Sequence, residues 1–365
     1  MIPPVSPEHR LALLLPGDPL TLTGGYLYDQ RIAAGLRERG WQVDVLALHE
    51  SFPQPTPTAL VDAHERLQSL PDGALVLIDG LALGAMPEVA LRHAQRLRLL
   101  ALVHHPLALE TGLDAARADA LRDSERRALQ AVRAVIVTSA ETAANLGPYA
   151  VAADRITVIE PGTDLAPLAQ PRSVPRNTRL ELLAVATLSA RKGHELLFQA
   201  LGALRQYDWH LTCVGSTTRD VDTAAGLQRQ IAAAGLQARI TLHGEVDQIT
   251  LQQFYRRADV FVQASHHEGY GMALAEALAQ GLPAVSTATG AAPRLLASGN
   301  GLLVEPGSVS ALQSALMRLL VDPDVLPRLA EAAWRARVAL RSWPQAAADC
   351  DQLLSTLANE PVALS

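Results

Sequence analysis

Residues 259 to 287 constrain the fold of this chain most strongly, because two strand patterns enclose a glycine loop and a helix pattern. The first strand pattern, DVFVQAS, is β-branched and apolar. After the loop, Met272 to Gln280 are rich in Ala and Leu, which favour a helix. Gly281 ends that helix, and Pro283 prevents its continuation. This order of elements predicts an α/β protein with parallel strands.

The loop carries two glycines, and one carboxylate precedes it while a second lies in the helix that follows. Gly269 and Gly271 lie on either side of Tyr270, so the backbone there can approach a ligand without obstruction by Cβ atoms. The N–H groups at the start of the following helix favour an anion. Glu268 and Glu276 bracket the loop, and carboxylates accept hydrogen bonds from hydroxyls. A ligand with both phosphate and hydroxyl groups, such as a nucleotide sugar, fits this pattern; two solvated glutamates in an ordinary α/β unit are the alternative.

The composition of the 365-residue chain predicts about two globular domains. No apolar run approaches the ~20 residues of a membrane span, and the first residues lack a signal-peptide pattern. Cys213 and Cys350 lie far apart without the spacing of metal ligands, which favours a reduced, cytoplasmic protein. A net charge of −6 argues against a non-specific nucleic-acid binder.

A single lysine, Lys192, occurs among the 31 Lys and Arg residues. It lies in the segment SARKG, between a strand pattern and a helix pattern. Lysine is a compact point charge that can contact a phosphate where a planar guanidinium does not fit. Lys192 is therefore a candidate phosphate ligand, although one lysine can also fall in such a loop by chance.

Strand and helix patterns alternate along both halves of the chain. A helix from about Tyr26 to Arg39 follows a loop with Gly24 and Gly25, but no GxGxxG is present, which argues against a dinucleotide dehydrogenase. Strands are expected at residues 10–17, 41–48, 74–79, 97–103, 134–138 and 156–159, and then at 180–186, 209–214, 239–243, 260–264 and 284–287. Late helices are expected at 308–321, 323–340 and 344–357.

The proline-rich, aperiodic segment 166–178 is the expected linker between two doubly wound domains that face each other across a cleft. The expected domains are residues 1–165 and 179–340, followed by a C-terminal segment, 341–365. Ligands of such domains bind at the carboxyl ends of the strands.

At this point the chain resembles a retaining glycosyltransferase of family 4, with the GT-B fold. The resemblance covers nearly the full length and depends most on the Glu-x7-Glu block from Glu268 to Glu276. Weaker motifs in matching order are TGG at Thr23–Gly25, PGTD at 161–164, RKGHELLFQAL and GLLVEPGSVSAL. The helix after Trp343 resembles the segment that crosses back to the first domain in such enzymes.

The resemblance implies roles for residues of the second domain. Glu268 would bind hydroxyls of the donor sugar, Glu276 would bind the ribose, and Lys192 would neutralise the diphosphate. Further donor-binding groups would be Gly269, Tyr270, Gly271 and Met272. Many family members carry Gly-Arg at the end of the first strand of this domain. Here Ala186-Thr187 stands in that place, and Arg191 is the residue that could replace the missing arginine.

In the first domain, Gly24 and Gly25 would approach the diphosphate and the acceptor. A histidine at a strand end usually contacts the donor sugar in this family. Both His104 and His105 follow the strand at 97–103, and the sequence does not choose between them.

The implied reaction moves a sugar from a nucleoside-diphosphate sugar, UDP favoured and GDP next, to a small-molecule, glycan or lipid-linked acceptor. The resemblance implies that the reaction retains the configuration of the sugar and that the enzyme needs no metal or other cofactor. Two alternatives stay open: an epimerase of the same fold, and a non-catalytic protein that binds nucleotide sugars.

Overall fold

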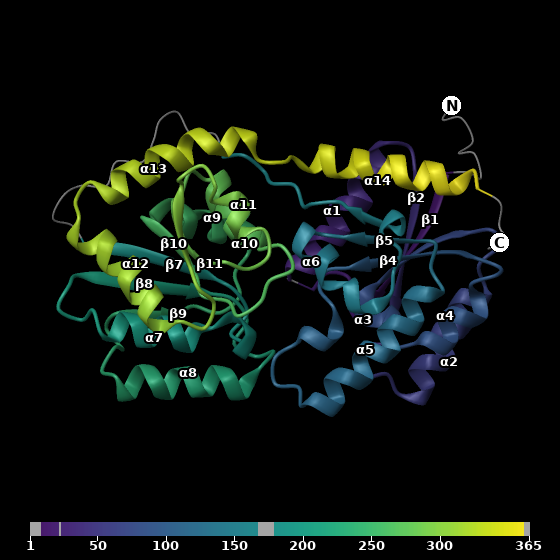
Figure 1. Ribbon diagram of the computed structural model, residues 1–365, viewed down its shortest axis with the longest axis horizontal. Helices are drawn as coiled ribbons and strands as arrows, with labels where there is room; N and C mark the ends of the chain where they lie inside the picture. Colours follow the sequence, from purple (N-terminus) through teal and green to yellow (C-terminus); the bar gives the residue numbers. More distant parts are fainter. Residues whose placement is uncertain (1–8, 22, 167–178, 361–365) are drawn as a thin grey trace. The chain divides into compact units, whose positions relative to one another are not determined.

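The computed structural model describes residues 9–21, 23–166 and 179–360. The described chain forms two compact units, each built on its own sheet (Figure 1). The first unit runs to Gly162 and resumes at Arg341, and the second spans Thr163–Leu340. The expected linker at 166–178 falls, apart from its first residue, outside the described residues.

The first unit has a six-stranded parallel sheet in the order β2-β1-β3-β4-β5-β6. Its strands are β1 (Arg10–Pro16), β2 (Gln42–Leu48), β3 (Leu75–Asp79), β4 (Arg98–Val103), β5 (Ala134–Val137) and β6 (Ile156–Val158). Its α-helices are α1 (Gly24–Glu38), α2 (Pro57–Gln68), α3 (Gly80–Leu83), α4 (Pro87–His93), α5 (Ala115–Gln130), α6 (Ala140–Asn145) and α14 (Trp343–Ala358). Short 3-10 turns lie at Leu107–Leu109, Gly147–Tyr149 and Ala153–Arg155.

The second unit has a six-stranded parallel sheet in the order β12-β11-β10-β7-β8-β9. Its strands are β7 (Leu180–Val185), β8 (Trp209–Val214), β9 (Ile240–Leu242), β10 (Val260–Gln263), β11 (Ala284–Thr287) and β12 (Gly301–Val304). Its α-helices are α7 (His194–Gly202), α8 (Val221–Ala233), α9 (Gln248–Arg257), α10 (Met272–Ala279), α11 (Ala292–Leu295), α12 (Val309–Val321) and α13 (Val325–Ala336). Short 3-10 turns lie at Ala190–Lys192 and Arg337–Ala339.

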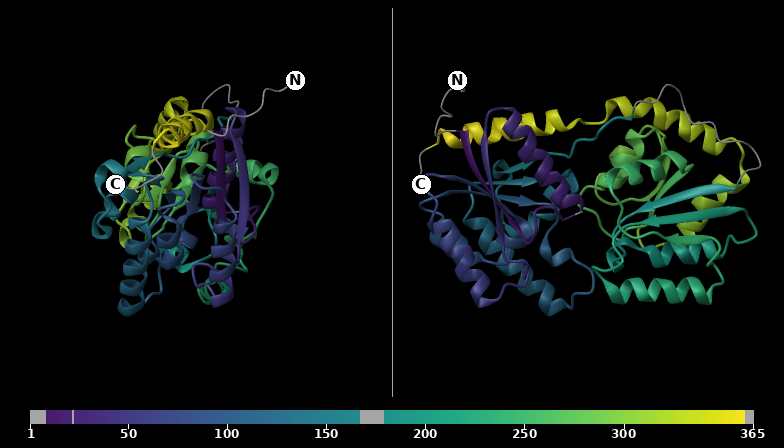
Figure 2. Two further views of the ribbon diagram at one scale, coloured as in Figure 1. Left: turned by 90° about the vertical axis from the view of Figure 1, so that its right-hand side faces the viewer. Right: turned by 180° about the vertical axis from the view of Figure 1, so that it is seen from behind.

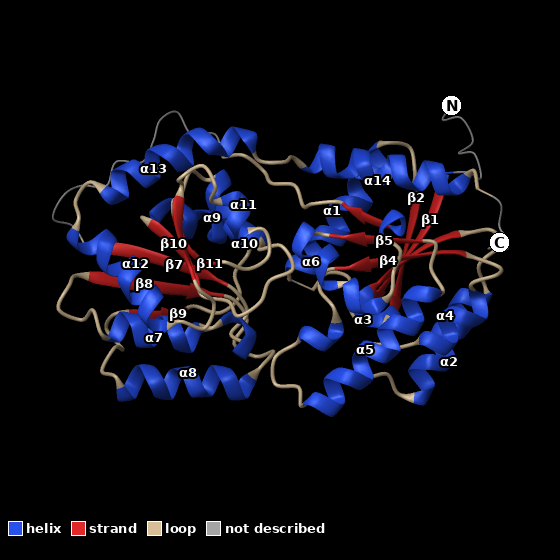
Figure 3. Ribbon diagram, viewed as in Figure 1, coloured by secondary structure: helices blue, strands red, loops and turns tan. Residues whose placement is uncertain are grey.

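Each sheet is covered by helices on both faces, which Figure 3 shows as red strands between blue helices. In the second unit, alternate residues of β7 enter different cores because successive side chains of a strand point to opposite faces. Leu182 packs with residues of α7, α8 and α12, whereas Leu183 packs with residues of α9, α10 and α11. Burial on both faces explains why these strands are continuous apolar runs in the sequence.

In each sheet the strand order reverses its direction at one point, the topological switch point. Ligands of open α/β sheets bind beside this reversal, at the carboxyl ends of the strands. In the second unit the reversal lies between β7 and β10. The chain leaves β7 toward Lys192 and leaves β10 toward Glu268. In the first unit the reversal lies between β1 and β3, which lead to Gly24 and Asp79.

The C-terminal helix α14 belongs to the first unit and packs along α1 (Figure 2). The Nε1–H of Trp41 donates to Asp351 Oδ1 at 2.9 Å, and Arg39 Nε lies 3.0 Å from Asp351 Oδ2. At Gly162 a Cβ would lie 2.1 Å from the backbone N of Trp343, so the backbones approach too closely for any side chain there. The expected return of the last helix to the first domain is therefore confirmed.

Three local expectations need correction. α1 begins at Gly24 instead of Tyr26, because Thr23 caps it by accepting from the N–H of Tyr26. The helix expected at 323–340 ends at Ala336, and a 3-10 turn follows. The strand β12 was not expected, since GLLV is short and three of its four residues are only partly buried or exposed.

We predict that Gly35→Leu destabilises the first unit, because a Cβ at Gly35 would lie 2.5 Å from the Cβ of Ala347 in α14. Overpacking of this kind costs about 1–3 kcal/mol, which urea unfolding followed by tryptophan fluorescence can measure. Ala34→Leu, at an exposed position of the same helix, is the control and should change stability little. Equal effects of the two substitutions would contradict close packing of α1 and α14.

Candidate active site

Two loops of the second unit are bound tightly to each other at the carboxyl ends of β7 and β10. Gly193 has φ +63°, and a Cβ there would lie 2.1 Å from the carbonyl oxygen of Ala264. The backbone N–H of His266 donates to the carbonyl of Arg191 at 2.9 Å. These contacts bring residues 190–193 against residues 264–268.

Glu268 is a buried carboxylate held by two cations and one hydroxyl. Lys192 Nζ lies 2.6 Å from Oε1, and the Ser265 hydroxyl donates to the same oxygen at 2.6 Å. Arg191 Nη1 lies 3.7 Å from Oε2 and donates to the carbonyl of His267 at 2.9 Å. Burial alone would raise the pKa of Glu268, but Lys192, Arg191 and the hydrogen bonds lower it to about 2. Glu268 is therefore ionised at neutral pH.

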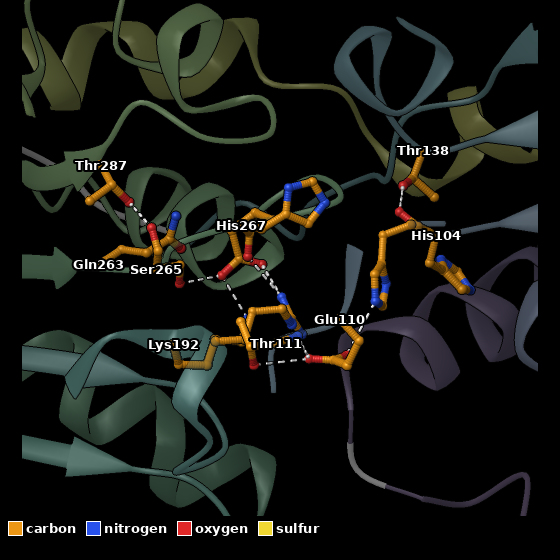
Figure 4. Close-up of polar contacts among 12 residues, drawn as sticks. His104, Glu110, Thr111, Thr138, Lys192, Gln263, Ser265, His267 and Thr287 are labelled. Atoms are coloured by element: carbon orange, nitrogen blue, oxygen red, sulfur yellow. Dashed lines mark hydrogen bonds and ion pairs between the residues drawn. The ribbon is translucent and has the colours of Figure 1, made fainter. Parts of the chain in front are cut away.

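A chain of hydrogen bonds among buried polar residues fixes Ser265. The hydroxyl of Thr287 donates to the carbonyl of Ser265 at 2.7 Å (Figure 4). Gln263 Nε2 donates to Ser286 Oγ at 3.3 Å. These hydrogen bonds link the ends of β10 and β11 and hold Ser265 in place, and its hydroxyl donates to Glu268.

A small cavity of about 10 Å³ lies beside the Lys192–Glu268 pair, and Gln263, Ser265 and His194 line it. A cavity of this size holds about one water molecule. His194 is buried, and its Nδ1 has no hydrogen-bond partner among the described residues. Burial and the charge of Lys192 lower the pKa of His194 to about 4, so His194 is neutral beside the cation.

The glycine loop before α10 depends on close backbone approaches. Gly271 has φ +98°, and α10 begins at the next residue, Met272, without a side-chain cap. Gly290 has φ +56°, and a Cβ there would lie 2.8 Å from the carbonyl oxygen of Tyr270. The N–H of Ala291 donates to that carbonyl at 2.9 Å. The segment Gly290-Ala291 thus supports the loop by its backbone.

Glu276 lies on the second turn of α10 and is partly exposed. The hydroxyl of Tyr255 donates to its Oε2 at 3.0 Å. Glu268 and Glu276 thus differ in surroundings, since the first is paired with cations and the second contacts a neutral phenol.

In the first unit, His104 follows β4 and packs against the start of α1. A Cβ at Gly25 would lie 3.2 Å from the ring of His104. Its Nε2 lies 3.2 Å from Asp29 Oδ1 and 3.6 Å from Asp79 Oδ2. Burial alone would lower the pKa of His104, but the charge and hydrogen bond of Asp29, together with Asp79, raise it above the ordinary value.

His105 lies in different surroundings, with Nε2 3.4 Å from Glu110 Oε2. Gly24 is exposed in the first turn of α1, and Gly25 is partly buried against His104. Of the two histidines that the sequence left open, His104 is the one beside the glycines.

Asp29, Asp79 and His104 each offer one ligand atom within 4.8 Å of the others, so this cluster could hold a metal ion. The 3.2 Å contact is also an ordinary hydrogen-bond distance, and burial together with Asp29 raises the pKa of Asp79. Hydrogen bonding among the three side chains is therefore the alternative to a bound metal.

Paired aspartates are a second pattern to consider as metal ligands, and Asp-x-Asp sequences occur at 220–222, 322–324 and 349–351. Asp220 caps α8, and Asp351 holds Trp41.

Sequence reasoning missed Asp29, Asp79, Ser265 and Tyr255. Asp79 ends β3, and this position at a strand's carboxyl end is a signal that could have identified it. Ser265 ends the strand pattern DVFVQAS and carries the same signal, whereas Asp29 and Tyr255 carry none, since their partners are set by packing. His266 Nε2 lies 3.1 Å from Glu195, and the ring of His243 packs against Phe254.

Comparisons with known proteins agree with this architecture. The family model "Glycosyl transferases group 1" matches residues 169–335, and "Glycosyltransferase Family 4" matches residues 74–167. The structure of sucrose-phosphate synthase from Thermosynechococcus elongatus superimposes with a TM-score of 0.81, at 23% identity, over 96% of this chain and 99% of that one. This chain has the GT-B fold.

Anabaena Alr3699/HepE, solved in complex with UDP and glucose, shares this GT-B fold with a TM-score of 0.74 and 18% identity over 95% of this chain and 100% of that one. A D-inositol 3-phosphate glycosyltransferase of Arthrobacter sp. (strain FB24) is 33% identical over 217 residues. That match covers 55% of this chain and 50% of the relative's length. Within the described residues of this GT-B chain, we find no helix with the length and apolar character to span a membrane.

We predict that Asp29→Asn lowers the pKa of His104, because an amide does not stabilise the imidazolium charge. NMR titration can measure this, with His104→Gln identifying the resonance among the 11 histidines. The stabilisation by this ion pair is present below the unfolded-state pKa of about 6.5 and is lost as pH rises through the higher folded-state pKa. Glu110→Gln, beside His105, should leave the midpoint unchanged, and an unchanged midpoint in Asp29→Asn would disprove the assigned pairing.

A double-mutant cycle tests the pair of Lys192 and Glu268. Lys192→Met should destabilise the second unit, because the buried carboxylate loses its nearest cation. Adding Glu268→Gln should restore part of the loss, with a coupling energy of about 0.5–3 kcal/mol in urea unfolding. Strictly additive effects would show that the 2.6 Å contact contributes no stability.

Proposed function

We propose that this protein is a glycosyltransferase that moves a sugar from a nucleoside-diphosphate sugar to an acceptor with retention of configuration. The observation that carries the proposal is the grouping of Lys192, Arg191 and ionised Glu268 at the ends of β7 and β10. This position is the crossover reversal of the sheet, where ligands of α/β proteins bind.

The cations and the start of α10 suit a departing diphosphate. Breaking the glycosidic bond places negative charge on the leaving group, and preorganised donors lower that barrier. An ammonium has three donors, so Lys192 can serve Glu268 and a phosphate together. Arg191 supplies the second cation in place of the arginine that family members carry after the first strand. The N–H groups of Gly269, Tyr270, Gly271 and Met272 face the same leaving group.

The carboxylates suit hydroxyl groups. Ionised Glu268 accepts hydrogen bonds from hydroxyls of the donor sugar, and Glu276 accepts them from the ribose. These are binding roles, because neither glutamate is required as a nucleophile when the acceptor attacks from the face that the leaving phosphate occupies. From the first unit, His104, whose pKa Asp29 and Asp79 raise, and the backbone at Gly24 and Gly25 are proposed to contact the donor.

UDP is the favoured nucleotide and GDP the second, and the complex of the structurally similar Anabaena protein with UDP supports this order. The first acceptor to test is D-inositol 3-phosphate, which the matched relative's name specifies. We propose that no metal takes part, so turnover should persist in EDTA; its loss on chelation and recovery with a divalent cation would reject this point. The setting of the reaction is proposed to be the cytoplasm.

We predict that Glu276→Ala lowers kcat/KM for the donor by roughly 10- to 100-fold, the loss of one or two hydrogen bonds to a charged group. Release of UDP from UDP-glucose in the presence of acceptor measures this, after a thermal-shift panel of nucleoside diphosphates has identified the base. The matched control is Glu331→Ala, which removes a glutamate of α13 that pairs with Arg335 on the same helix. Wild-type turnover by folded Glu276→Ala would reject the assigned site, and donor binding without transfer to any acceptor would favour a non-catalytic binding protein.

A further inference from the structure

Tyr255 is a buried aromatic residue of α9 whose hydroxyl reaches the neighbouring helix α10. Its Oη lies 3.0 Å from Glu276 Oε2 and 3.3 Å from the carbonyl oxygen of Ala273. Ala273 and Glu276 are three residues apart, so they lie on the same side of α10. The phenol thus contacts one helical turn at the residue to which the ribose is assigned.

The ring of Tyr255 cannot turn away from this position. It is 2% exposed and packs in the apolar core that contains Phe261 and Leu274, with its ring centroid 6.3 Å from that of Phe261. Burial and the nearby charge of Glu276 raise the pKa of Tyr255 well above its ordinary value. The hydroxyl therefore stays protonated and remains a hydrogen-bond donor at any physiological pH.

We propose that Tyr255 is a positioning residue that orients the carboxylate of Glu276 for the ribose hydroxyls of the donor nucleotide. This inference rests on the proposed function, since it assigns a task within the same donor site. A partly exposed glutamate loses side-chain freedom when it binds a ligand, and a partner that orders it beforehand reduces that cost. The phenol is neutral, so this hydrogen bond orients the carboxylate of Glu276 without forming an ion pair with it.

The test compares affinities for two nucleotides that differ only in the ribose. Calorimetry measures the Kd of UDP and of 2′,3′-dideoxy-UDP, or of the GDP pair if GDP is the nucleotide that binds. The ratio of the two Kd values reports recognition of the ribose hydroxyls. A partly unfolded variant weakens both ligands by the same factor, so the ratio is insensitive to a loss of folded protein.

Wild-type protein should prefer the ribonucleotide, Glu276→Ala should remove most of that preference, and Tyr255→Phe should reduce it by about 3- to 10-fold, the effect of one hydrogen bond. Tyr207→Phe is the matched control at a partly buried tyrosine of the same unit, and it should keep the wild-type ratio.

The outcomes separate this inference from the proposed function. If Glu276→Ala loses the preference and Tyr255→Phe keeps it, the positioning role of Tyr255 is overturned while the donor site stands. If neither UDP nor GDP binds, or if Glu276→Ala keeps the full preference, the donor site itself is wrong and the inference falls with it.

Discussion

The site in the second unit depends on keeping one carboxylate charged inside the protein. Moving an ion from water into a protein interior costs several kcal/mol unless paired charges and hydrogen bonds replace its hydration. Glu268 meets this requirement only because Lys192, Arg191 and Ser265 surround it. Those partners come from two loops that are distant in sequence, so the loops must touch. The close approach of Gly193 to the backbone of Ala264 is the contact between the two loops.

The protein handles its other carboxylates differently, and the difference matches the tasks proposed for them. Asp29 and Asp79 both lie beside the imidazole of His104, and together they raise its pKa above the ordinary value. Glu276 contacts a phenol that carries no charge. These carboxylates therefore differ from Glu268 in their partners, which are an imidazole for Asp29 and Asp79 and a phenol for Glu276.

Much of the fold could be predicted because burial on both faces leaves a local mark, the continuous apolar run, as in residues 10–17. The partly exposed edge strand β12 left no such mark. In the candidate site, the glycine loop and Lys192 were predicted from sequence, since residue type and position next to a strand end are local properties, and the structure places them at the carboxyl ends of β10 and β7. Asp29 and Tyr255 were not, because their partners lie 75 and 21 residues away and only packing brings them together.

The return of α14 to the first unit has a consequence for synthesis of the chain. The face of α1 that α14 covers, and the indole N–H of Trp41 in the connection after α1, receive their partners only when residues 343–358 have emerged from the ribosome. The second unit is by then fully translated, although it follows the first in sequence. The first unit therefore begins to be synthesised before the second unit but is completed after it. The face of α1 that packs against α14 stays uncovered in the meantime.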